Sequence, residues 1–569
     1  MPRNDPGRDG RDRAGVETCR AAGRAAGRGV AATALAPVTG ASDGSAPSGA
    51  DLVYPPRYPR LLTGLSPRRR LGGAAIAGAL AGLGQAPFDL WPLTILALAF
   101  VQLMALPTTR ARQAAVVWWA AGSGYFALSL SWIVEPFLVD IARHGWMAPF
   151  ALIFMATGLA LFWGAAGALA RALIRSRGAA FAMATVLAFL LMGWLRGVIF
   201  TGFPWALPGH VLIPTPALAW AQWGGAMGLG ALVLTLATTL PLTRMRPALG
   251  LPIWTLALAA IMGIGHLATP APGDMTGRPV VRIVQPNAPQ DEKWDPLLAR
   301  GHFDRTLAMT EAPGSPDLVV WPETSVPAWL EQVPDLMPVL STSARDVPMV
   351  FGINRGDDDL RIYNSLVQLS AGGEIAQIYD KHHLVPFGEY IPLGDLLGGL
   401  GLRGLAQRDG NGFSRGPGAQ LINVPGIGPM LPLICYEGVF ARDIHAAPAR
   451  AEALLLITND AWFGTVSGPY QHLAQARLRA VEQGLPMIRA ANTGISAMID
   501  PAGRLIDPMA LGTAGIRDVP LPPARPAPVY ARIGDLPLVG LVIVALLTLV
   551  AGARSNARRF RVDAPSGRG

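Results

Sequence analysis

The stretch LPLICYEG, residues 431–438, decides how the second half of the chain is expected to fold. Four of its first five residues are apolar, as in a strand of a parallel sheet that is covered on both faces. Cys435 follows where the run turns polar, beside Tyr436 and Glu437. A free cysteine is most often a small buried hydrophobic residue, but a thiol at the end of a strand can also act as a nucleophile. The rest of the chain has to separate these two interpretations.

The chain contains only two cysteines, Cys19 and Cys435, and they lie in regions of very different composition. A structural disulfide between them is therefore not expected. If Cys435 faces an oxidising compartment, an unpaired thiol there has to be explained by its chemistry.

Composition places the chain among membrane proteins. It has 569 residues, of which 51% are hydrophobic and 15% charged, and a mean hydropathy of +0.35. These values are too apolar for an ordinary soluble protein and predict a membrane protein with an attached domain. The net charge of +9 comes from arginine-rich termini and short loops, so it bears on membrane orientation. No segment resembles a nucleic-acid module, and no nucleic-acid partner is expected.

Residues 1–70 are rich in Arg, Gly, Ala, Pro and Ser and have no hydrophobic period, so they are expected to be a disordered extension. A cleaved signal peptide fits poorly, because no short apolar core stands near Met1. An over-extended start codon would also account for this segment.

Apolar runs then fill the chain to about residue 268, and one more stands near the C-terminus. Most approach the roughly 20 residues that a helix needs to cross the hydrocarbon, although the first two are short enough for a tight hairpin or a re-entrant pair. The runs are 71–87, 91–107, 114–134, 147–170, 178–200, 216–240, 251–268 and 536–553. They predict a transmembrane domain of about seven helices at 71–268, and a last transmembrane helix at 536–553 before a basic cytoplasmic tail at 554–569.

Loop charge predicts the orientation of these helices, because Lys and Arg gather in cytoplasmic loops. Arginines occur in alternate connections, while the intervening loops carry almost none apart from Arg143. The arginine-bearing connections hold Arg110 and Arg112; Arg171, Arg175 and Arg177; Arg244 and Arg246; and Arg554, Arg558, Arg559 and Arg561. Eight spans with both termini in the cytoplasm satisfy this pattern. Residues 270–530 are then expected in the periplasm of a bacterial cell, with the helices in its inner membrane.

The segment 270–530 alternates between strand-like and helix-like stretches. Its short apolar runs are bounded by Gly, Pro and Asn, and helical patterns lie between several of them, notably at 471–483. The runs are VVRIVQ, DLVVWPE, PMVFGIN, NSLVQLS, LPLICYE, ALLLITND, PMIRAAN and ISAMIDP. The alternation predicts an α/β or layered α+β domain with strands buried between helices.

Three predicted strands of this segment end on a reactive side chain: Glu323, Lys381 and Cys435. Each alone has an ordinary explanation as a solvated charge or a buried thiol. Together they supply a nucleophile, a base for its proton and a cation for an oxyanion. No GxSxG elbow offers a competing serine nucleophile. The histidines form only a weak case for a metal site, so no metal or cofactor is expected; they are His382, His383 and His472.

The Glu-Lys-Cys set resembles the carbon-nitrogen hydrolase (nitrilase) superfamily. Wider strings resemble its membrane-embedded bacterial branch, the apolipoprotein N-acyltransferase family. These strings are WPETSVP, YDKHHLVPFGEYIPL, ICYE, TNDAWFG, GPYQHLAQARLRAVE, GQAPFDLWP and WLRGVIFTGFPW. The resemblance covers about residues 71–553 and leaves the first 70 outside.

The resemblance implies a periplasmic αββα nitrilase-like catalytic domain at 270–530 on eight transmembrane helices. It implies that Cys435 attacks an acyl ester of a phospholipid, typically the sn-1 chain of phosphatidylethanolamine. The resulting thioester would pass its acyl chain to the α-amine of the diacylglyceryl-cysteine of an apolipoprotein, the last step of lipoprotein maturation. Glu323 would be the general base, and Lys381 would stabilise the oxyanion.

Matching the motifs of this family also assigns supporting residues. Glu389 and Glu437 would be accessory carboxylates, and substrate contact or gating would fall to Trp294, Tyr436 and Trp462, although ordinary packing explains an aromatic residue equally well. Arg196, near the end of the fifth run, is expected to meet phospholipid head groups or a carboxylate, because a charge inside the membrane is costly.

Two alternatives stay open at this point. A membrane-tethered amidase or nitrilase would use the same three residues to hydrolyse a C–N bond, although a tether needs only one span. A transporter or scaffold with an inactive domain would not need the intact set. The protonation state of Cys435 is open as well, since Glu437 would raise the thiol pKa if close and Lys381 would lower it.

Overall fold

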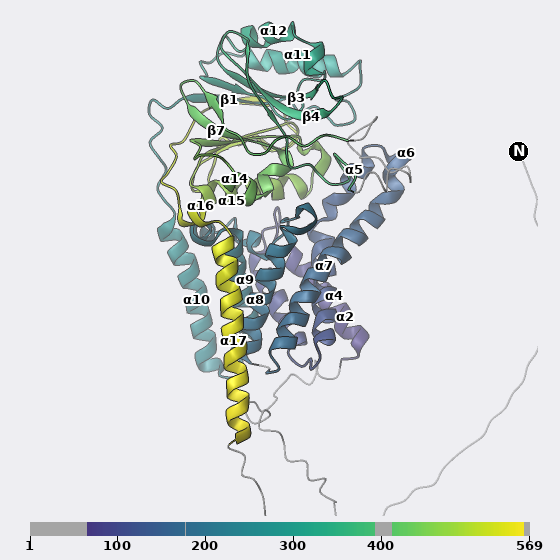
Figure 1. The fold of residues 1–569 in the computed structure, drawn as a ribbon, viewed down its shortest axis with the longest axis vertical. Helices are drawn as coiled ribbons and strands as arrows, with labels where there is room; N and C mark the ends of the chain where they lie inside the picture. The colour runs from purple at the N-terminus through teal and green to yellow at the C-terminus, as the bar shows by residue number, and fades with distance from the viewer. Residues whose placement is uncertain (1–64, 177, 393–411, 563–569) are drawn as a thin grey trace, which may run out of the picture. The chain divides into compact units, whose positions relative to one another are not determined.

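The computed structural model describes residues 65–176, 178–392 and 412–562. They form a helical part and an α/β part (Figure 1). The predicted disordered extension at 1–70, with Cys19, lies almost wholly outside the described residues.

Eight apolar helices occupy the predicted runs. They are α2 (Pro67–Gly82), α3 (Trp91–Ala105), α4 (Ala111–Ser129), α7 (Ala148–Leu173), α8 (Ala179–Arg196), α9 (Ala221–Thr243), α10 (Pro247–Ala268) and α17 (Leu536–Val562). Among the described helices, five segments are long and apolar enough to cross a membrane: Ile141–Leu173, Ala179–Arg196, Pro216–Thr243, Pro247–Ala268 and Leu536–Ser555. Helices α2 and α3 have only 16 and 15 residues. Helix α17 continues to Val562, so the predicted tail at 554–569 begins as helix.

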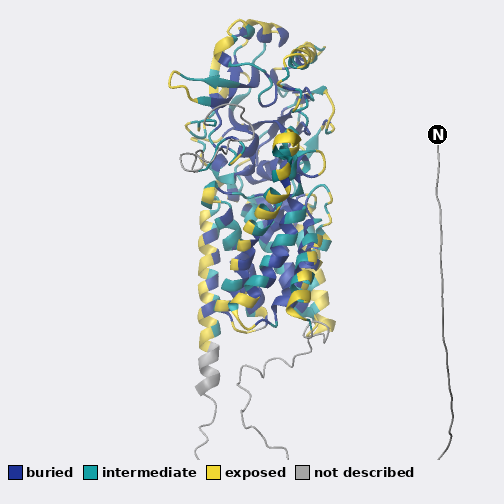
Figure 2. Ribbon diagram, turned by 90° about the vertical axis from the view of Figure 1, so that its right-hand side faces the viewer, coloured by how far each residue is buried: buried dark blue, intermediate teal, exposed yellow. Residues whose placement is uncertain are grey.

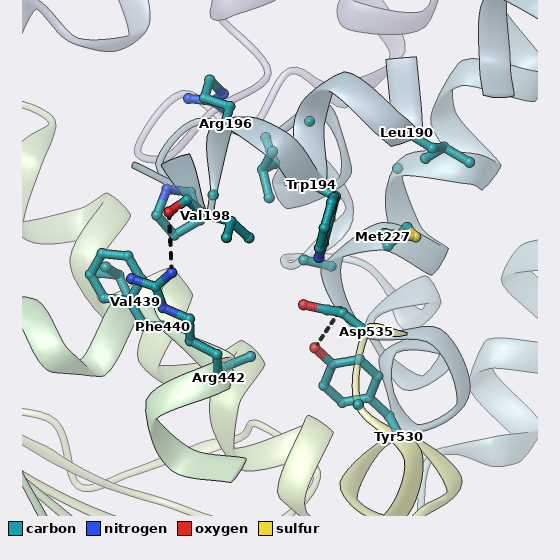
Figure 3. A pocket seen from close by; sticks show the side chains of 18 of the residues that line it. Leu190, Trp194, Arg196, Val198, Met227, Val439, Phe440, Arg442, Tyr530 and Asp535 are labelled. Carbon is teal, nitrogen blue, oxygen red and sulfur yellow. Dashed lines mark hydrogen bonds between the residues drawn. The ribbon is translucent and has the colours of Figure 1, made fainter. Parts of the chain in front are cut away.

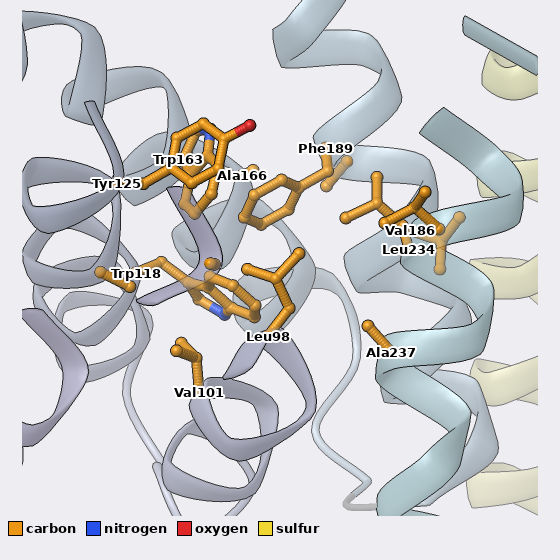
Figure 4. Close-up of a cluster of buried hydrophobic side chains, with 14 of the residues drawn as sticks. Leu98, Val101, Trp118, Tyr125, Trp163, Ala166, Val186, Phe189, Leu234 and Ala237 are labelled. Carbon is orange, nitrogen blue, oxygen red and sulfur yellow. The ribbon is translucent and has the colours of Figure 1, made fainter. Parts of the chain in front are cut away.

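Aromatic side chains fill the centre of the helical bundle (Figure 4). The ring of Trp118 lies 4.6 Å from that of Phe189 and 6.2 Å from that of Trp163. Helices α2 and α4 approach so closely that a Cβ on Gly78 would stand 1.8 Å from the carbonyl oxygen of Ala121. Small residues allow such contacts between membrane helices, because the backbones themselves can pack.

The outer faces of the bundle are apolar yet exposed (Figure 2). On α17, Leu541, Val544 and Leu547 are each at least 60% exposed. In water such an exposed apolar surface would favour aggregation, but in a bilayer it is the surface expected to contact the hydrocarbon.

The α/β part contains two six-stranded sheets. Their strand orders are β12-β1-β2-β3-β4-β5 and β11-β10-β9-β8-β7-β6. The first sheet has β1 (Val280–Gln285), β2 (Leu318–Val320), β3 (Met349–Gly356), β4 (Ile362–Leu369), β5 (Ile375–Asp380) and β12 (Gly515–Pro520). The second has β6 (Ile422–Val424), β7 (Gly428–Ile434), β8 (Ala453–Thr458), β9 (Met487–Ala491), β10 (Ala497–Ile499) and β11 (Leu505–Ile506). Strands β6, β11 and β12 were absent from the sequence-based expectation.

The two sheets pack on each other through one buried apolar cluster that includes Ile283 from the first sheet and Ile434 and Ile457 from the second. Helices cover the outer faces: α11 (Ala299–Thr310) and α12 (Leu336–Ser343) lie over the first sheet, and α14 (Ala441–His445) and α15 (Gly468–Gln483) lie against the second (Figure 1). These layers confirm the expected αββα arrangement.

The direction of the central strands places the reactive side chains. Strand β7 runs parallel to β8, with Ile434 opposite Ile457, and β8 runs parallel to β9. Cys435 therefore follows the end of a buried parallel strand, as its sequence indicated. Side chains at the carboxyl ends of parallel strands share one edge of a sheet, which is where active sites are commonly built.

One glutamine, Gln471 in α15, connects the α/β part to the membrane helices. Its Oε1 accepts hydrogen bonds from the indole N–H groups of Trp132, at 3.3 Å, and Trp205, at 2.7 Å. Its Nε2 donates to the carbonyl oxygens of Ala86, at 3.2 Å, and Ser129, at 2.9 Å. All four hydrogen-bonding positions of the amide are thus used to join three segments of the helical part.

Replacing Gln471 by alanine is expected to destabilise the junction, because it leaves buried indole N–H groups without acceptors. Each unpaired buried group costs about 1–3 kcal/mol. The measurement is the apparent Tm of the full-length protein in detergent. Gln475→Ala is the matched control, since Gln475 lies one turn further along α15 and, within the described residues, its side chain makes a single 3.4 Å bond inside the helix. Equal shifts for the two variants would contradict the prediction.

Candidate active site

The structure brings Glu323, Lys381 and Cys435 together. Glu323 follows β2, Lys381 follows β5 and Cys435 follows β7, and all three are buried. The Nζ of Lys381 lies 3.6 Å from Oε1 of Glu323, and both charges act electrostatically on the thiol of Cys435. Residues from two different sheets thus form one cluster.

Lys381 is held between two carboxylates. Its Nζ donates a hydrogen bond of 2.8 Å to Oε1 of Glu389, in addition to its approach to Glu323. Burial alone would lower the pKa of Lys381, but the charges of Glu389 and Glu323 raise it well above its usual value. The side chain is therefore a fixed ammonium, as stabilisation of an oxyanion requires.

Hydrogen bonds fix both oxygens of Glu323. Asn364 donates to Oε1 at 2.7 Å, and the backbone N–H of Asn459 donates to Oε2 at 2.8 Å. The Nζ of Lys293 donates to the backbone carbonyl of Glu323 at 3.2 Å, and burial lowers the pKa of this lysine to about 8 although Glu323 opposes the shift. None of these three residues was singled out from the sequence, although Asn459 lies in TNDAWFG and Lys293 in EKWD.

Cys435 has a left-handed backbone, with φ of 52°, where the short helix η8 (Cys435–Val439) begins. Such φ values are uncommon for residues other than glycine and cluster at functional sites. Burial raises the pKa of the thiol well above its usual value; the Glu323 carboxylate adds to the rise and Lys381 opposes it. The side chain of Cys435 is therefore a thiol at rest, and it would need a base to act as a nucleophile.

Alkylation of Cys435 by iodoacetamide is expected to speed up with pH through pH 9 without levelling off. Only the thiolate reacts, and its fraction grows about tenfold per pH unit below the pKa. The experiment uses a Cys19→Ser background, because these are the only two cysteines, and intact mass gives the rate. A plateau below pH 8 would show a preformed thiolate and contradict the prediction.

Glu437 organises the segment that carries Lys381. Its carboxylate accepts hydrogen bonds from the backbone N–H groups of Ile434, His382 and His383 at 2.8–3.1 Å, and from the hydroxyl of Tyr379 at 2.9 Å. Burial acts to raise the pKa of Glu437, but the bonds and charge of His382 lower it overall. Burial and Glu323, rather than Glu437, account for the raised pKa of the thiol.

A second buried network supports the backbone of Cys435. His472 Nε2 lies 3.2 Å from the carbonyl oxygen of Cys435, and its Nδ1 lies 2.8 Å from Oδ1 of Asp460. Arg489 donates to the other oxygen of Asp460 at 2.5 Å. Although burial acts to raise it, Arg489 and His472 lower the pKa of Asp460 to about 2. Asp460 is thus an ionised anchor that the sequence did not reveal, although it too lies in TNDAWFG.

The four residues expected to contact substrate have different surroundings. Tyr436 is buried, and its hydroxyl donates to the carbonyl oxygen of Gly202 at 3.2 Å. Trp462 is half-buried in η9 (Asp460–Phe463), and Trp294 is 36% exposed in the loop after β1. Within the described residues, none of these three side chains makes a hydrogen bond or ring contact with Glu323, Lys381 or Cys435, so their roles stay predictions.

Arg196 is the last residue of α8 and is buried. Its guanidinium donates to the carbonyl oxygen of Trp205 at 2.8 Å and lies over the ring of Phe126 at 5.1 Å. The partner in this structure is thus a backbone carbonyl, where the sequence led us to expect a carboxylate or a phospholipid head group. Among the described residues, no three His, Cys, Asp or Glu side chains gather into a metal-binding group.

Comparison with known proteins identifies both parts of the chain. Residues 281–527 match the family described as Carbon-nitrogen hydrolase, and residues 77–239 match the Apolipoprotein N-acyltransferase N-terminal domain. An apolipoprotein N-acyltransferase from Brucella melitensis is 38% identical over 518 residues, which cover 86% of this chain and 97% of that protein. The chain belongs to the apolipoprotein N-acyltransferase family. It is an enzyme of the N-acyltransferase type within the carbon-nitrogen hydrolase superfamily.

Other similar proteins include the apolipoprotein N-acyltransferase of Rhodopseudomonas palustris, which is 35% identical over 514 residues, covering 84% of this chain and 95% of that one. Among solved structures, an amidase from Nesterenkonia sp. aligns with 46% of this chain and 95% of its own, with a TM-score of 0.33 and 18% identity.

Proposed function

We propose that this protein transfers an acyl chain from a phospholipid to the N-terminal amine of the diacylglyceryl-cysteine of apolipoproteins, through a thioester on Cys435. The observation that carries the proposal is the convergence of Glu323, Lys381 and Cys435 from three strand ends into one buried cluster. In this proposal the donor is the sn-1 chain of phosphatidylethanolamine, and the enzyme works in the bacterial inner membrane with its α/β domain in the periplasm.

In the first step Glu323 takes the proton of the Cys435 thiol as the sulfur attacks the ester carbonyl of the phospholipid. The negative charge that forms on the carbonyl oxygen is stabilised by the ammonium of Lys381. The C–O bond then breaks, and Glu323 returns the proton to the leaving alcohol, which departs as a lysophospholipid. The acyl chain remains on sulfur.

In the second step the α-amine of the apolipoprotein attacks the thioester carbonyl. Lys381 again stabilises the oxyanion, and Glu323 takes a proton from the attacking nitrogen. When the C–S bond breaks, Glu323 gives that proton to the sulfur. The products are the amide and the free thiol of Cys435, and Glu323 is again a carboxylate. Donor and acceptor use the site in turn, which is a ping-pong sequence.

Intact mass spectrometry tests this proposal directly. Purified full-length protein incubated with phosphatidylethanolamine is expected to gain the mass of one acyl chain, and Cys435→Ala is expected to gain none. Adding a diacylglyceryl-lipopeptide should discharge the adduct and yield N-acylated lipopeptide. Release of free fatty acid at the same rate with and without lipopeptide would instead indicate a membrane-tethered hydrolase, and an adduct on Cys435→Ala would overturn the assignment of the nucleophile.

A further inference from the structure

A cavity of about 540 Å³ lies where the membrane helices α8, α9 and α17 meet the α/β domain (Figure 3). The domain contributes residues of α14 and α15 and of α16 (Val529–Ile533). Glu323, Lys381 and Cys435 are not among its lining residues, so the cavity is separate from the catalytic cluster.

The wall formed by the membrane helices is apolar. Leu190 and Met192 of α8 and Met227 and Leu234 of α9 line it, and no charged side chain of α9 does. This wall is suited to an acyl chain, because ligand pockets bury most of an apolar ligand against such side chains.

The side of the cavity next to the domain is cationic, and the end of α8 contributes to it. Four arginines and one aspartate line the cavity: Arg196, Arg442, Arg479, Arg532 and Asp535. The aspartate already accepts a hydrogen bond of 2.7 Å from the hydroxyl of Tyr530 (Figure 3). The cavity therefore carries an excess of positive charge on one side only.

Two of these arginines have N–H groups that bind no acceptor among the described residues. Arg479 is buried, and its Nε has no hydrogen-bond partner among the described residues, although its other nitrogens bind Val439 and Glu482. Arg532 is exposed and uses its Nε on the carbonyl oxygen of Ala527. The Nε of Arg479 is enclosed by protein, whereas the guanidinium of Arg532 is exposed and can donate to an anionic ligand.

The charged side lies at the end of the membrane helices. Arg196 is the last residue of α8 and Leu536 is the first of α17, whereas Leu190 and Leu234 lie nearer the middle of their helices. Cations at the helix ends above an apolar wall match the two halves of a membrane lipid, whose phosphate sits at the head-group level.

We propose that this cavity binds a membrane phospholipid, separate from the acyl donor at Cys435, with its phosphate at Arg442 and Arg532 and an acyl chain between α8 and α9. Guanidinium groups are well matched to phosphate oxygens. The acceptor lipopeptide fits less well, because it carries a cationic amine and no phosphate. Val439 and Phe440 form part of the same wall. They lie four and five residues after Cys435, so a bound lipid would also pack against the segment that follows the strand β7.

Photocrosslinking tests the proposal without relying on acyl transfer. Full-length Cys435→Ala protein, which cannot consume the probe, is mixed with phosphatidylglycerol that carries a diazirine on one acyl chain. We expect crosslinks in residues 189–197 and 226–234, mapped by peptide mass spectrometry. Diacylglycerol with the same diazirine chain lacks the phosphate and should label these peptides about tenfold less, the equivalent of one lost charge-assisted hydrogen bond.

Matched variants separate the cavity from the rest of the lipid-facing surface. A Cβ on Gly193 would meet only Leu207, at 3.7 Å, so Gly193→Leu can fill the cavity and should abolish labelling. Gly158→Leu is the control, since a Cβ there on α7 meets nothing within 4 Å. The double variant Arg442→Gln/Arg532→Gln should weaken labelling by phosphatidylglycerol and leave labelling by diacylglycerol unchanged.

Three outcomes would overturn the proposal. The first is equal labelling of Gly193→Leu and Gly158→Leu, which would mean that the lipid binds the outer surface only. The second is equal labelling by phosphatidylglycerol and diacylglycerol. The third is labelling that a diacylglyceryl-lipopeptide displaces and unlabelled phosphatidylglycerol does not, which would assign the cavity to the acceptor.

Discussion

Replacing Glu323 by glutamine is expected to slow formation of the acyl adduct on Cys435 by about 10²- to 10⁴-fold, the usual contribution of a general base. The thiol has a raised pKa and cannot ionise on its own at neutral pH. Glutamine keeps the size and hydrogen-bonding reach of the side chain, but it cannot accept a proton. The rate is measured by single-turnover mass spectrometry with phosphatidylethanolamine.

Alkylation by iodoacetamide provides the control for Glu323→Gln. The Glu323 carboxylate raises the pKa of the thiol, so removing its charge should leave the alkylation of Cys435 unchanged or faster while acylation falls. A parallel loss of both reactions would mean that the substitution has damaged the pocket rather than removed a base.

Replacing Lys381 by methionine is expected to lower the rate of acylation by about 10²- to 10³-fold, the range found for a single oxyanion donor. Methionine fills a similar volume but carries no charge. The substitution also leaves Glu323 and Glu389 buried without their shared cation, and breaking a buried ion pair in this way costs about 3–5 kcal/mol. Both the single-turnover rate and the apparent Tm should fall.

A second substitution separates these two effects. In Lys381→Met/Glu389→Gln one of the unpaired carboxylates is removed, so much of the lost Tm should return. Activity should not return, because the oxyanion still lacks its cation. Recovery of acylation together with Tm would show that Lys381 acts only by holding the pocket together.

Hydrophobic runs predicted most of the fold. Each apolar run became a helix, since about 20 apolar residues have few other ways to satisfy their backbone in a bilayer. The strands with strong apolar runs were also predicted, among them β7 and β8. Strand β11 has two residues, β6 has three and β12 is half-exposed, so their pairing depends on neighbouring strands and leaves no clear pattern in the sequence.

Glu323, Lys381 and Cys435 could be singled out from the sequence because each stands at the end of an apolar run, and their catalytic roles stay predictions. The residues that hold them in place could not be predicted in this way. Lys293, Asn364 and Asn459 matter through their contacts with Glu323, which lies 30 to 136 positions away in the chain. Asp460 matters through its contacts with His472 and Arg489. The same limit applies to Arg196. The sequence showed that a charge at this position is energetically costly in a membrane, but only the structure shows that its guanidinium donates to a backbone carbonyl oxygen.

The hydrogen bonds of Gln471 bear on how this enzyme can be divided. A soluble version cut to residues 270–530 would lose both indole groups and both carbonyls that surround this amide, and it would expose the apolar face of α15 that now packs against the bundle. We therefore expect a fragment cut to these residues to aggregate. On this expectation the helices belong to the folding unit of the α/β domain, and inhibitors are to be sought against the whole protein in a lipid or detergent environment.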